Sequence, residues 1–185
     1  MDRIAAAFSA APRRLFLPRG ARWRAALDAP ILIGHGQTNS QPRTVAAMLR
    51  LLDVRRGDRV LDVGSGSGWT TALLAHLTGP EGEVVGVELE PDLVTFGGAN
   101  LDRLGLPWAS IRAATPGVLG LPALAPYDRI LVSAMARDLP DELVGQLTDD
   151  GRMVVPVAGR MLLVERTAAG TEVSTHGEYR FVPLR

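Results

Sequence analysis

A turn of alternating glycine and serine, Gly64-Ser65-Gly66-Ser67-Gly68, most constrains how this chain of 185 residues can fold. It directly follows the apolar run 59–63 and precedes an apolar stretch with helical spacing. A second apolar run, 84–87, ends in Glu88, twenty residues after the last glycine of the turn. This order of strand, glycine turn, helix, strand and acid is typical of a Rossmann-like unit. There the glycines let the backbone approach a ligand, and the acid accepts hydrogen bonds from ribose hydroxyls. The turn therefore predicts a cofactor that contains a nucleoside.

The spacing of the glycines distinguishes between two classes of cofactor. Dinucleotide sites use G-x-G-x-x-G, whose third glycine would fall at position 69, and that position is Trp69. The G-x-G-x-G of this chain instead suits S-adenosylmethionine, which has no pyrophosphate to place on a helix N-terminus. A glycine-rich turn without any ligand is the alternative, and the flanking strands and Glu88 weigh against it. We therefore expect S-adenosylmethionine as the cofactor.

Apolar strands alternate with helices after residue 58, which predicts an α/β fold. We expect strands at 59–63, 83–88, 109–113, 128–133 and 152–156, and helices at 68–77, 91–104 and 140–147. Such strands indicate a parallel sheet covered on both faces. The last short runs, 161–165, 171–174 and 181–184, have short loops between them, which favours antiparallel pairing at one edge. The expected fold is thus a Rossmann-like class I methyltransferase, mostly parallel, with helices on both faces and an antiparallel C-terminal edge.

The N-terminal part of the chain has a different character from the rest. Prolines divide it into short helical stretches, and Pro42 stands at the first turn of an amphipathic helix. We expect a single domain over 1–185, with a helical lid or substrate segment at 1–57 and a cofactor-binding core at 58–185. Ligands bind beyond the carboxyl ends of parallel strands. The expected rim therefore comprises Gly64–Gly68, Glu88–Glu90, residues 114–120 and residues 133–135.

Composition excludes several classes of function. A net charge of zero gives no general attraction to nucleic acid or acidic membranes. The absence of cysteine excludes disulfides, thiolate nucleophiles, zinc–thiolate sites and iron–sulfur clusters. No apolar run is long enough to span a membrane, and the N-terminus lacks the pattern of a signal peptide. We expect a cytoplasmic monomer that binds neither nucleic acid nor membrane, and no metal.

The segment 33–42, I-G-H-G-Q-T-N-S-Q-P, gathers glycines, hydroxyls and amides just before the helix at Pro42. This composition predicts a flexible polar loop, in which Asn39 or Ser40 could cap the helix. Capping and a functional site do not exclude each other. For His35, contact with a ligand and simple loop packing are equally open.

This loop belongs to a set of short segments that run in order along the chain. They are Ala7-Phe8, Pro12-Arg13, Phe16-Leu17-Pro18, Asp28-Ala29-Pro30, 33–38, Ser40-Gln41-Pro42, 60–68, 125–128, Gly151-Arg152, 155–157 and 181–184. On these segments the chain resembles the protein-L-isoaspartate O-methyltransferase family. The G-Q-T-x-S-Q-P element is distinctive for that family, whereas the glycine turn fits most methyltransferases of this fold.

The resemblance implies transfer of a methyl group from S-adenosylmethionine to the α-carboxylate of an L-isoaspartyl residue in a damaged protein or peptide. The ester then closes to a succinimide, whose hydrolysis returns some normal aspartate. A carboxylate with a pKa of about 3.3–4.3 is already ionised near neutral pH, so no general base is needed. Catalysis requires in-line placement of the carboxylate oxygen, the methyl carbon and the sulfur, with water excluded.

The resemblance also implies roles for individual residues. Ser40 matches the family's active-site serine, which would hydrogen-bond the substrate carboxylate or the methionine end of the cofactor. The expected cofactor-binding residues are Gln37, Thr38, Asp62, Gly64, Ser65, Gly66, Glu88 and Leu89. Among these, Glu88 would hold the ribose and Leu89 would lie against the adenine. Strand alternation predicts that Glu90 points away from the ribose.

Several positions depart from the family pattern. Pro116 stands where the family has the aspartate that holds the adenine amino group, and Asn39 replaces an apolar residue. Ala26 stands where a tyrosine is common, and the chain starts late in the family's opening helix. These departures indicate a divergent member and leave another substrate open.

Three alternatives therefore stand beside the repair reaction. One is a carboxyl methyltransferase for a dedicated partner peptide, as in natural-product tailoring. Another is a methyltransferase for a small molecule or a nucleic-acid base. Amino-methylating DNA enzymes, however, place an Asn/Asp-Pro-Pro-aromatic motif after the fourth strand, where this chain has residues 133–136, S-A-M-A. The third is a binding protein without catalysis.

Overall fold

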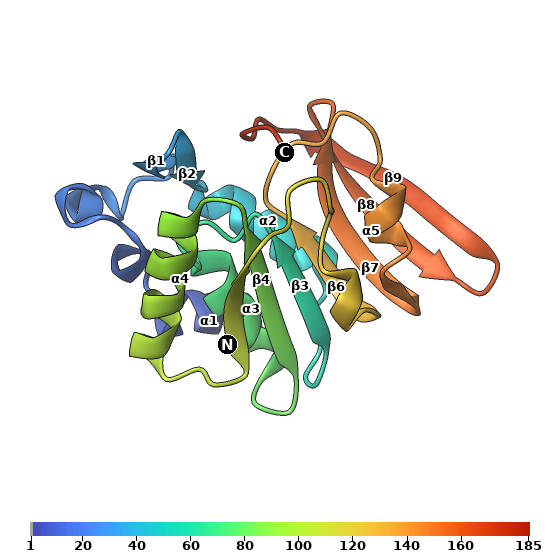
Figure 1. Cartoon of the computed structure of the whole chain (residues 1–185), viewed down its shortest axis with the longest axis horizontal. Helices are drawn as coiled ribbons and strands as arrows, with labels where there is room; N and C mark the ends of the chain where they lie inside the picture. Colours follow the sequence, from blue (N-terminus) through green and yellow to red (C-terminus); the bar gives the residue numbers. More distant parts are fainter. Residues whose placement is uncertain (1) are drawn as a thin grey trace.

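A seven-stranded sheet in the order β5-β4-β3-β6-β7-β8-β9 organises the computed structural model, which describes residues 2–185 (Figure 1). The strands are β3 (Arg59–Val63), β4 (Glu83–Glu88), β5 (Ala109–Ala113), β6 (Tyr127–Val132), β7 (Leu147–Val157), β8 (Arg160–Thr167) and β9 (Gly170–Glu178). Strands β3 to β7 pair in parallel, and β8 and β9 add antiparallel at one edge. The chain moves outward from β3 first toward β5 and then toward β9, so the topological switch point lies beside β3. The mostly parallel sheet with an antiparallel edge is confirmed.

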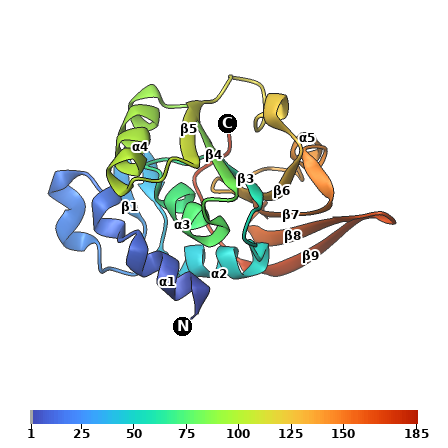
Figure 2. The same ribbon diagram turned by 90° about the horizontal axis from the view of Figure 1, so that it is seen from below.

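Helices cover both faces of the sheet, but unequally (Figure 2). The α-helices are α1 (Arg3–Ala10), α2 (Pro42–Leu52), α3 (Trp69–Thr78), α4 (Pro91–Leu104) and α5 (Asp141–Val144), and the 3-10 helices are η1 (Arg13–Phe16), η2 (Arg19–Arg24) and η3 (Pro122–Leu124). Alternate residues of β3 separate the two faces. Val60 packs with α1, α2 and α3, whereas Leu61 packs with α5 and the loop before it. Within residues 2–185, no helix is both long and apolar enough to cross a membrane.

Two elements differ from the sequence predictions. The helix expected at 140–147 ends at Val144, and Leu147 already begins β7. Between them, the side chain of Gln146 turns inward, where it accepts from Leu121 N at 2.9 Å and donates to a neighbouring carbonyl oxygen. The expected strand 181–184 is also wrong, because this segment pairs only with Met135, in the loop after β6, through an isolated bridge.

The expected loop at 33–42 contains a β-hairpin, made of β1 (Ile31–Gly34) and β2 (Gln37–Asn39). Its turn has positive φ angles of 108°, 52° and 71° at Gly34, His35 and Gly36. Glycine adopts positive φ angles readily, so the two glycines allow the chain to make this turn. Ile31 and Ile33 are buried against Leu17 and the start of α4, which anchors the hairpin. The polar segment is therefore held in a defined place.

Only part of the N-terminal segment lies over the carboxyl ends of the strands. Helices α1 and α2 belong to the same buried core as α3. Trp69, at the start of α3, donates from its indole nitrogen to Ala11 O at 3.0 Å, and its ring meets Phe8 edge-on. The stretch from Leu17 to the end of β2 leaves this core and reaches over the glycine turn.

Candidate active site

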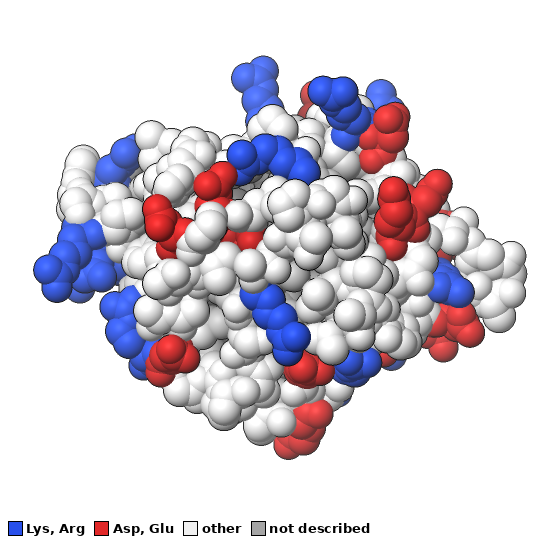
Figure 3. Space-filling view, viewed as in Figure 1, with Lys and Arg blue, Asp and Glu red and all other residues white. Residues whose placement is uncertain are grey.

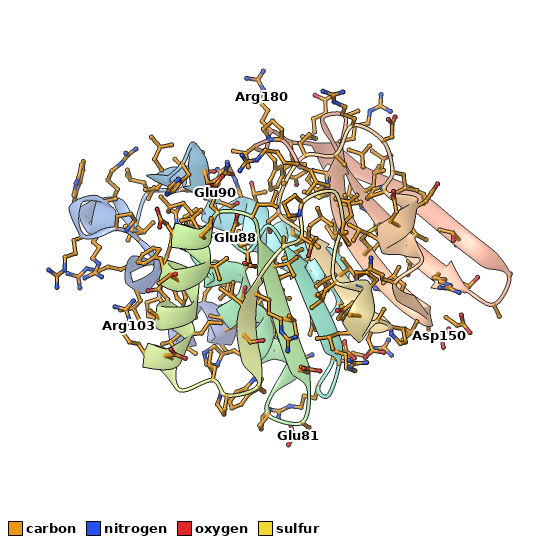
Figure 4. All side chains as sticks on the ribbon, viewed as in Figure 1. Glu81, Glu88, Glu90, Arg103, Asp150 and Arg180 are labelled. Atoms are coloured by element: carbon orange, nitrogen blue, oxygen red, sulfur yellow. The ribbon has the colours of Figure 1, made fainter. Side chains whose placement is uncertain are left out.

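A cavity opens at the carboxyl ends of the parallel strands, where the switch-point rule places a ligand, and its empty space together with adjoining open solvent is about 870 Å³. Figure 4 shows Glu88 and Glu90 at this end of the sheet and Glu81 at the opposite end. The cavity is lined by Gln37, Thr38, Asn39, Ser40, Val63, Gly64, Ser65, Gly66, Ser67, Trp69, Thr70, Val87, Glu88, Leu89, Ala114, Val118, Leu119, Gly120, Ser133, Ala134, Val182, Pro183, Leu184 and Arg185. Segments far apart in the chain thus meet around one space.

Almost all the predicted site residues lie on this cavity. The wall of the cavity includes Gln37, Thr38, Ser40, Gly64, Ser65, Gly66, Glu88 and Leu89. Asp62 is the exception, because it is completely buried behind the wall, one residue before Val63. The structure therefore brings the predicted residues together, with Asp62 in a supporting position.

The glycine turn folds tightly over the next strand. Gly64 N and Ser65 N both donate to Val87 O, at 2.9 and 3.1 Å. On β4, a Cβ at Gly86 would lie 2.8 Å from the Cβ of Ser65, so only glycine allows this approach. The sequence contained this signal, since Gly86 interrupts an otherwise apolar strand.

Glu88 fixes the shape of the turn from the end of β4. One carboxylate oxygen, Oε2, accepts from Gly66 N at 2.9 Å, and Oε1 accepts from Glu90 N at 3.0 Å. The side chain is buried yet lies on the cavity. An ionised carboxylate can accept about four hydrogen bonds, so capacity is left for ribose hydroxyls.

Asp62 provides an unpaired negative charge behind the turn. Its Oδ2 accepts from Thr70 Oγ1 and Thr71 Oγ1, both at 2.7 Å. Its Oδ1 and the nearby Ser65 Oγ have no hydrogen-bond partner among the residues described. Buried polar atoms are normally satisfied, so these two atoms call for a ligand. The ammonium group of S-adenosylmethionine supplies donors and positive charge, and the site fits this cofactor.

Asp62→Asn is expected to remove part of the pH dependence of stability. Burial raises the pKa of Asp62 from 3.8 to about 6, so the folded protein binds this proton more tightly than the unfolded chain. The residue thus favours folding below about pH 4, and that contribution is lost as the pH rises through about 6, by about 3 kcal/mol in total. Urea unfolding of both proteins between pH 4 and 7 measures the difference. Parallel pH profiles would contradict the shifted pKa.

Glu90 joins two segments that cover the cavity. Its carboxylate lies 3.6 Å from His35 Nδ1 at the tip of the hairpin and 2.6 Å from Arg185 Nη2. The other imidazole nitrogen, Nε2, lies 3.1 Å from Asp92 Oδ2. Sequence reasoning assigned Glu90 only a direction away from the ribose. Its partners stand 55 and 95 positions away, and no local pattern indicates such pairs.

A second, smaller cavity adjoins the first, and its empty space together with adjoining open solvent is about 370 Å³. It is lined by Pro30, Thr38, Ser40, Gln41, Thr44, Ser133, Arg180, Phe181 and Val182. Thr38, Ser40, Ser133 and Val182 belong to both linings. Residues that carry side-chain hydroxyls therefore stand at the junction of the two cavities.

Other lining residues were missed or differ from the family pattern. Pro116 is exposed in the turn after β5 and does not line the cavity. The part of the cavity wall that follows β5 is built from Ala114, Val118 and Leu119. Together with Leu89, these residues make this part of the lining apolar. The segment 182–185 was missed because its apolar residues predicted a strand.

The chain was compared with known proteins. The family model "Protein-L-isoaspartate(D-aspartate) O-methyltransferase (PCMT)" matches residues 1–185. The protein-L-isoaspartate O-methyltransferase of Methanothrix thermoacetophila is 47% identical, over 99% of this chain and 88% of that protein. The enzyme of that name from Methanopyrus kandleri is 44% identical, over 99% of this chain and 83% of that protein.

A solved structure leads to the same family. It is that of a putative protein-L-isoaspartate O-methyltransferase from Plasmodium falciparum, in complex with S-adenosyl-L-homocysteine. The match has a TM-score of 0.85 at 27% identity and covers 100% of this chain and 91% of that one. The chain therefore belongs to the protein-L-isoaspartate O-methyltransferase family and is an S-adenosylmethionine-dependent methyltransferase.

Proposed function

We propose that this protein methylates the α-carboxylate of L-isoaspartyl residues in proteins or peptides. The observation that carries the proposal is the junction at Thr38, Ser40 and Ser133, where the cofactor cavity meets the second, smaller cavity, called the groove below. An acceptor in the groove would reach the methyl group there and would need no general base, because a carboxylate is already ionised near neutral pH.

The residues of the chain have distinct tasks in this reaction. When bound, S-adenosylmethionine supplies an electrophilic methyl group on a positively charged sulfur. Glu88 and the glycine turn hold the nucleoside part, while Asp62 faces the amino group from behind the wall. Ser40 donates a hydrogen bond that orients the acceptor carboxylate. The hairpin and the segment 182–185 cover the site and exclude water, which favours in-line transfer.

The proposal includes a monomeric enzyme that acts in the cytoplasm without binding nucleic acid. Zero net charge supports the absence of nucleic-acid binding, because attraction to phosphates requires a basic surface. On the face shown in Figure 3, acidic and basic side chains are intermingled. Light scattering tests whether the protein is a monomer, and a binding assay at low salt tests whether it binds nucleic acid. A stable dimer or micromolar binding would contradict them.

A methylation assay tests the substrate. The protein is incubated with S-adenosylmethionine and a set of isoaspartyl peptides, each paired with the same peptide containing normal aspartate. We expect a base-labile methyl ester on the isoaspartyl peptides alone. No ester on any of them, with S-adenosylhomocysteine binding demonstrated, would reject the repair reaction.

Glu90→Gln is expected to speed dissociation of S-adenosylhomocysteine about threefold to tenfold. The substitution removes the charge that pairs with Arg185 and weakens the contact with His35, and an exposed ion pair contributes roughly 0.2–1 kcal/mol. Stopped-flow displacement measures the rate, with Asp141→Asn on α5 as the control. Equal rates for wild type and Glu90→Gln would show that these contacts do not hold the hairpin and the segment 182–185 over the cavity.

A further inference from the structure

Three buried polar side chains connect the N-terminal segment to the glycine turn. Arg13 Nε donates to Asn39 Oδ1 at 2.6 Å, and Asn39 Nδ2 donates to Ser67 Oγ at 3.2 Å. All three residues are at most 6% exposed. Ser67 O in turn accepts from Asn100 Nδ2 of α4 at 2.8 Å. We call Arg13, Asn39 and Ser67 the Arg13 relay.

The guanidinium of Arg13 also gathers the two ends of the hairpin. It donates to Leu27 O and Ala29 O, both at 2.8 Å, on the side that enters β1. It donates to Asn39 O at 3.0 Å and Ser40 O at 2.9 Å, on the side that leaves β2. A planar guanidinium presents five N–H donors in fixed directions, which suits several acceptors at once. The main chain of Ser40 is thereby held at the junction of the two cavities.

This arrangement is costly if its only purpose is to fill space. The guanidinium lies over the ring of Trp69 at 5.4 Å, and each oxygen that it bonds is uncharged. Burial lowers the pKa of Arg13 to about 10, offset in part by the nearby Asp28, so the group is still charged at neutral pH. A well-packed apolar side chain would often stabilise such a site equally well or better. The guanidinium group of Arg13 differs from an apolar side chain because it fixes the orientation of the surrounding carbonyl groups.

We infer that Arg13 and Asn39 are positioning residues for methyl transfer, which set Ser40 and Thr38 relative to the glycine turn. Ser40 and Thr38 flank Asn39 on β2 and at its end, and the relay ties Asn39 to the turn. The inference rests on the proposed function. Because misplacement by about 1 Å can cost roughly 100-fold in rate, loss of the relay affects turnover more than cofactor binding.

The test uses Arg13→Lys, Asn39→Leu and the double variant. A lysine keeps the charge but cannot reach all five oxygens, and leucine removes both hydrogen bonds of the Asn39 side chain. We expect kcat on an isoaspartyl peptide to fall about 10- to 100-fold in each single variant, with the Kd of S-adenosylhomocysteine unchanged within about twofold. The double variant should be no slower than the worse single, because both break the same connection. Arg14→Lys, at the exposed neighbour of Arg13, is the matched control and should keep full kcat.

Other outcomes would overturn the inference. They are an unchanged kcat in both single variants, an equal loss of kcat and cofactor affinity, or losses that multiply in the double variant. If Arg13→Lys does not fold, Asn39→Leu decides, because it leaves the main-chain bonds of Arg13 in place.

Amide hydrogen exchange of residues 37–41 gives a readout that does not depend on the substrate. Exchange should be faster in Arg13→Lys than in the wild type, and equal rates would overturn the inference. A wild type that binds S-adenosylhomocysteine but methylates no isoaspartyl peptide would instead reject the proposed function, and the exchange rates alone would then decide on the relay.

Discussion

Ser40→Ala is expected to lower kcat on an isoaspartyl peptide roughly 100-fold, while the Kd of S-adenosylhomocysteine changes less than about twofold. Misplacement of reacting groups by about 1 Å can cost roughly 100-fold in rate. Ser40 lies at the junction of the cofactor cavity and the groove, so its hydroxyl can act on the acceptor. Steady-state kinetics and calorimetry on the same preparations measure the two quantities.

Ser9→Ala provides the matched control for this prediction. Ser9 is an exposed serine on α1 whose hydroxyl donates only to Ala5 O, within its own helix, so kcat should not change. Equal turnover of Ser40→Ala and the wild type would remove Ser40 from the mechanism. A parallel loss of cofactor affinity would assign Ser40 to cofactor binding instead.

Glu88→Ala is expected to weaken binding of S-adenosylhomocysteine by about 1.5–3 kcal/mol, or roughly tenfold to 150-fold. The carboxylate both offers acceptors to the ribose and holds Gly66 N in the glycine turn, so the substitution removes ligand contacts and also loosens the turn. Titration calorimetry gives the Kd directly.

Glu83→Ala removes a carboxylate from the other end of the same strand. Glu83 is exposed and pairs with Arg59, far from the cavity, so cofactor affinity should be unaffected. An unchanged Kd in Glu88→Ala would mean that the ribose is held elsewhere.

The strands and the glycine turn were predictable because their physics is local. A strand buried on both faces requires a nearly continuous apolar run, as β3 and β4 have, and a turn that passes close to a ligand requires glycine. Glu88 follows from its place at the end of β4. The hairpin β1–β2 was hidden because its strands are short and its turn contains two glycines, which resemble a flexible loop.

The connections between segments were not predictable from one sequence. Arg13 and Asn39 are separated by 26 positions, and Glu90 and Arg185 by 95. No local pattern near either residue of a pair indicates its partner. The sequence left Asn39 or Ser40 as possible helix caps, yet Gln41 is the N-cap residue of α2, and Asp28 accepts from Arg43 N in its first turn. Only the folded chain shows where these side chains go.

The placement of α2 and of the segment 182–185 has a consequence for synthesis of the protein. Helix α2, near the start of the chain, packs against β7, and residues 182–185 complete the cavity that the turn at 64–68 begins. Folding therefore cannot proceed strictly from the N-terminus while the chain leaves the ribosome. A nascent chain that already displays the glycine turn lacks the last wall of its binding site, so tight capture of the cofactor marks a chain whose residues 182–185 are in place.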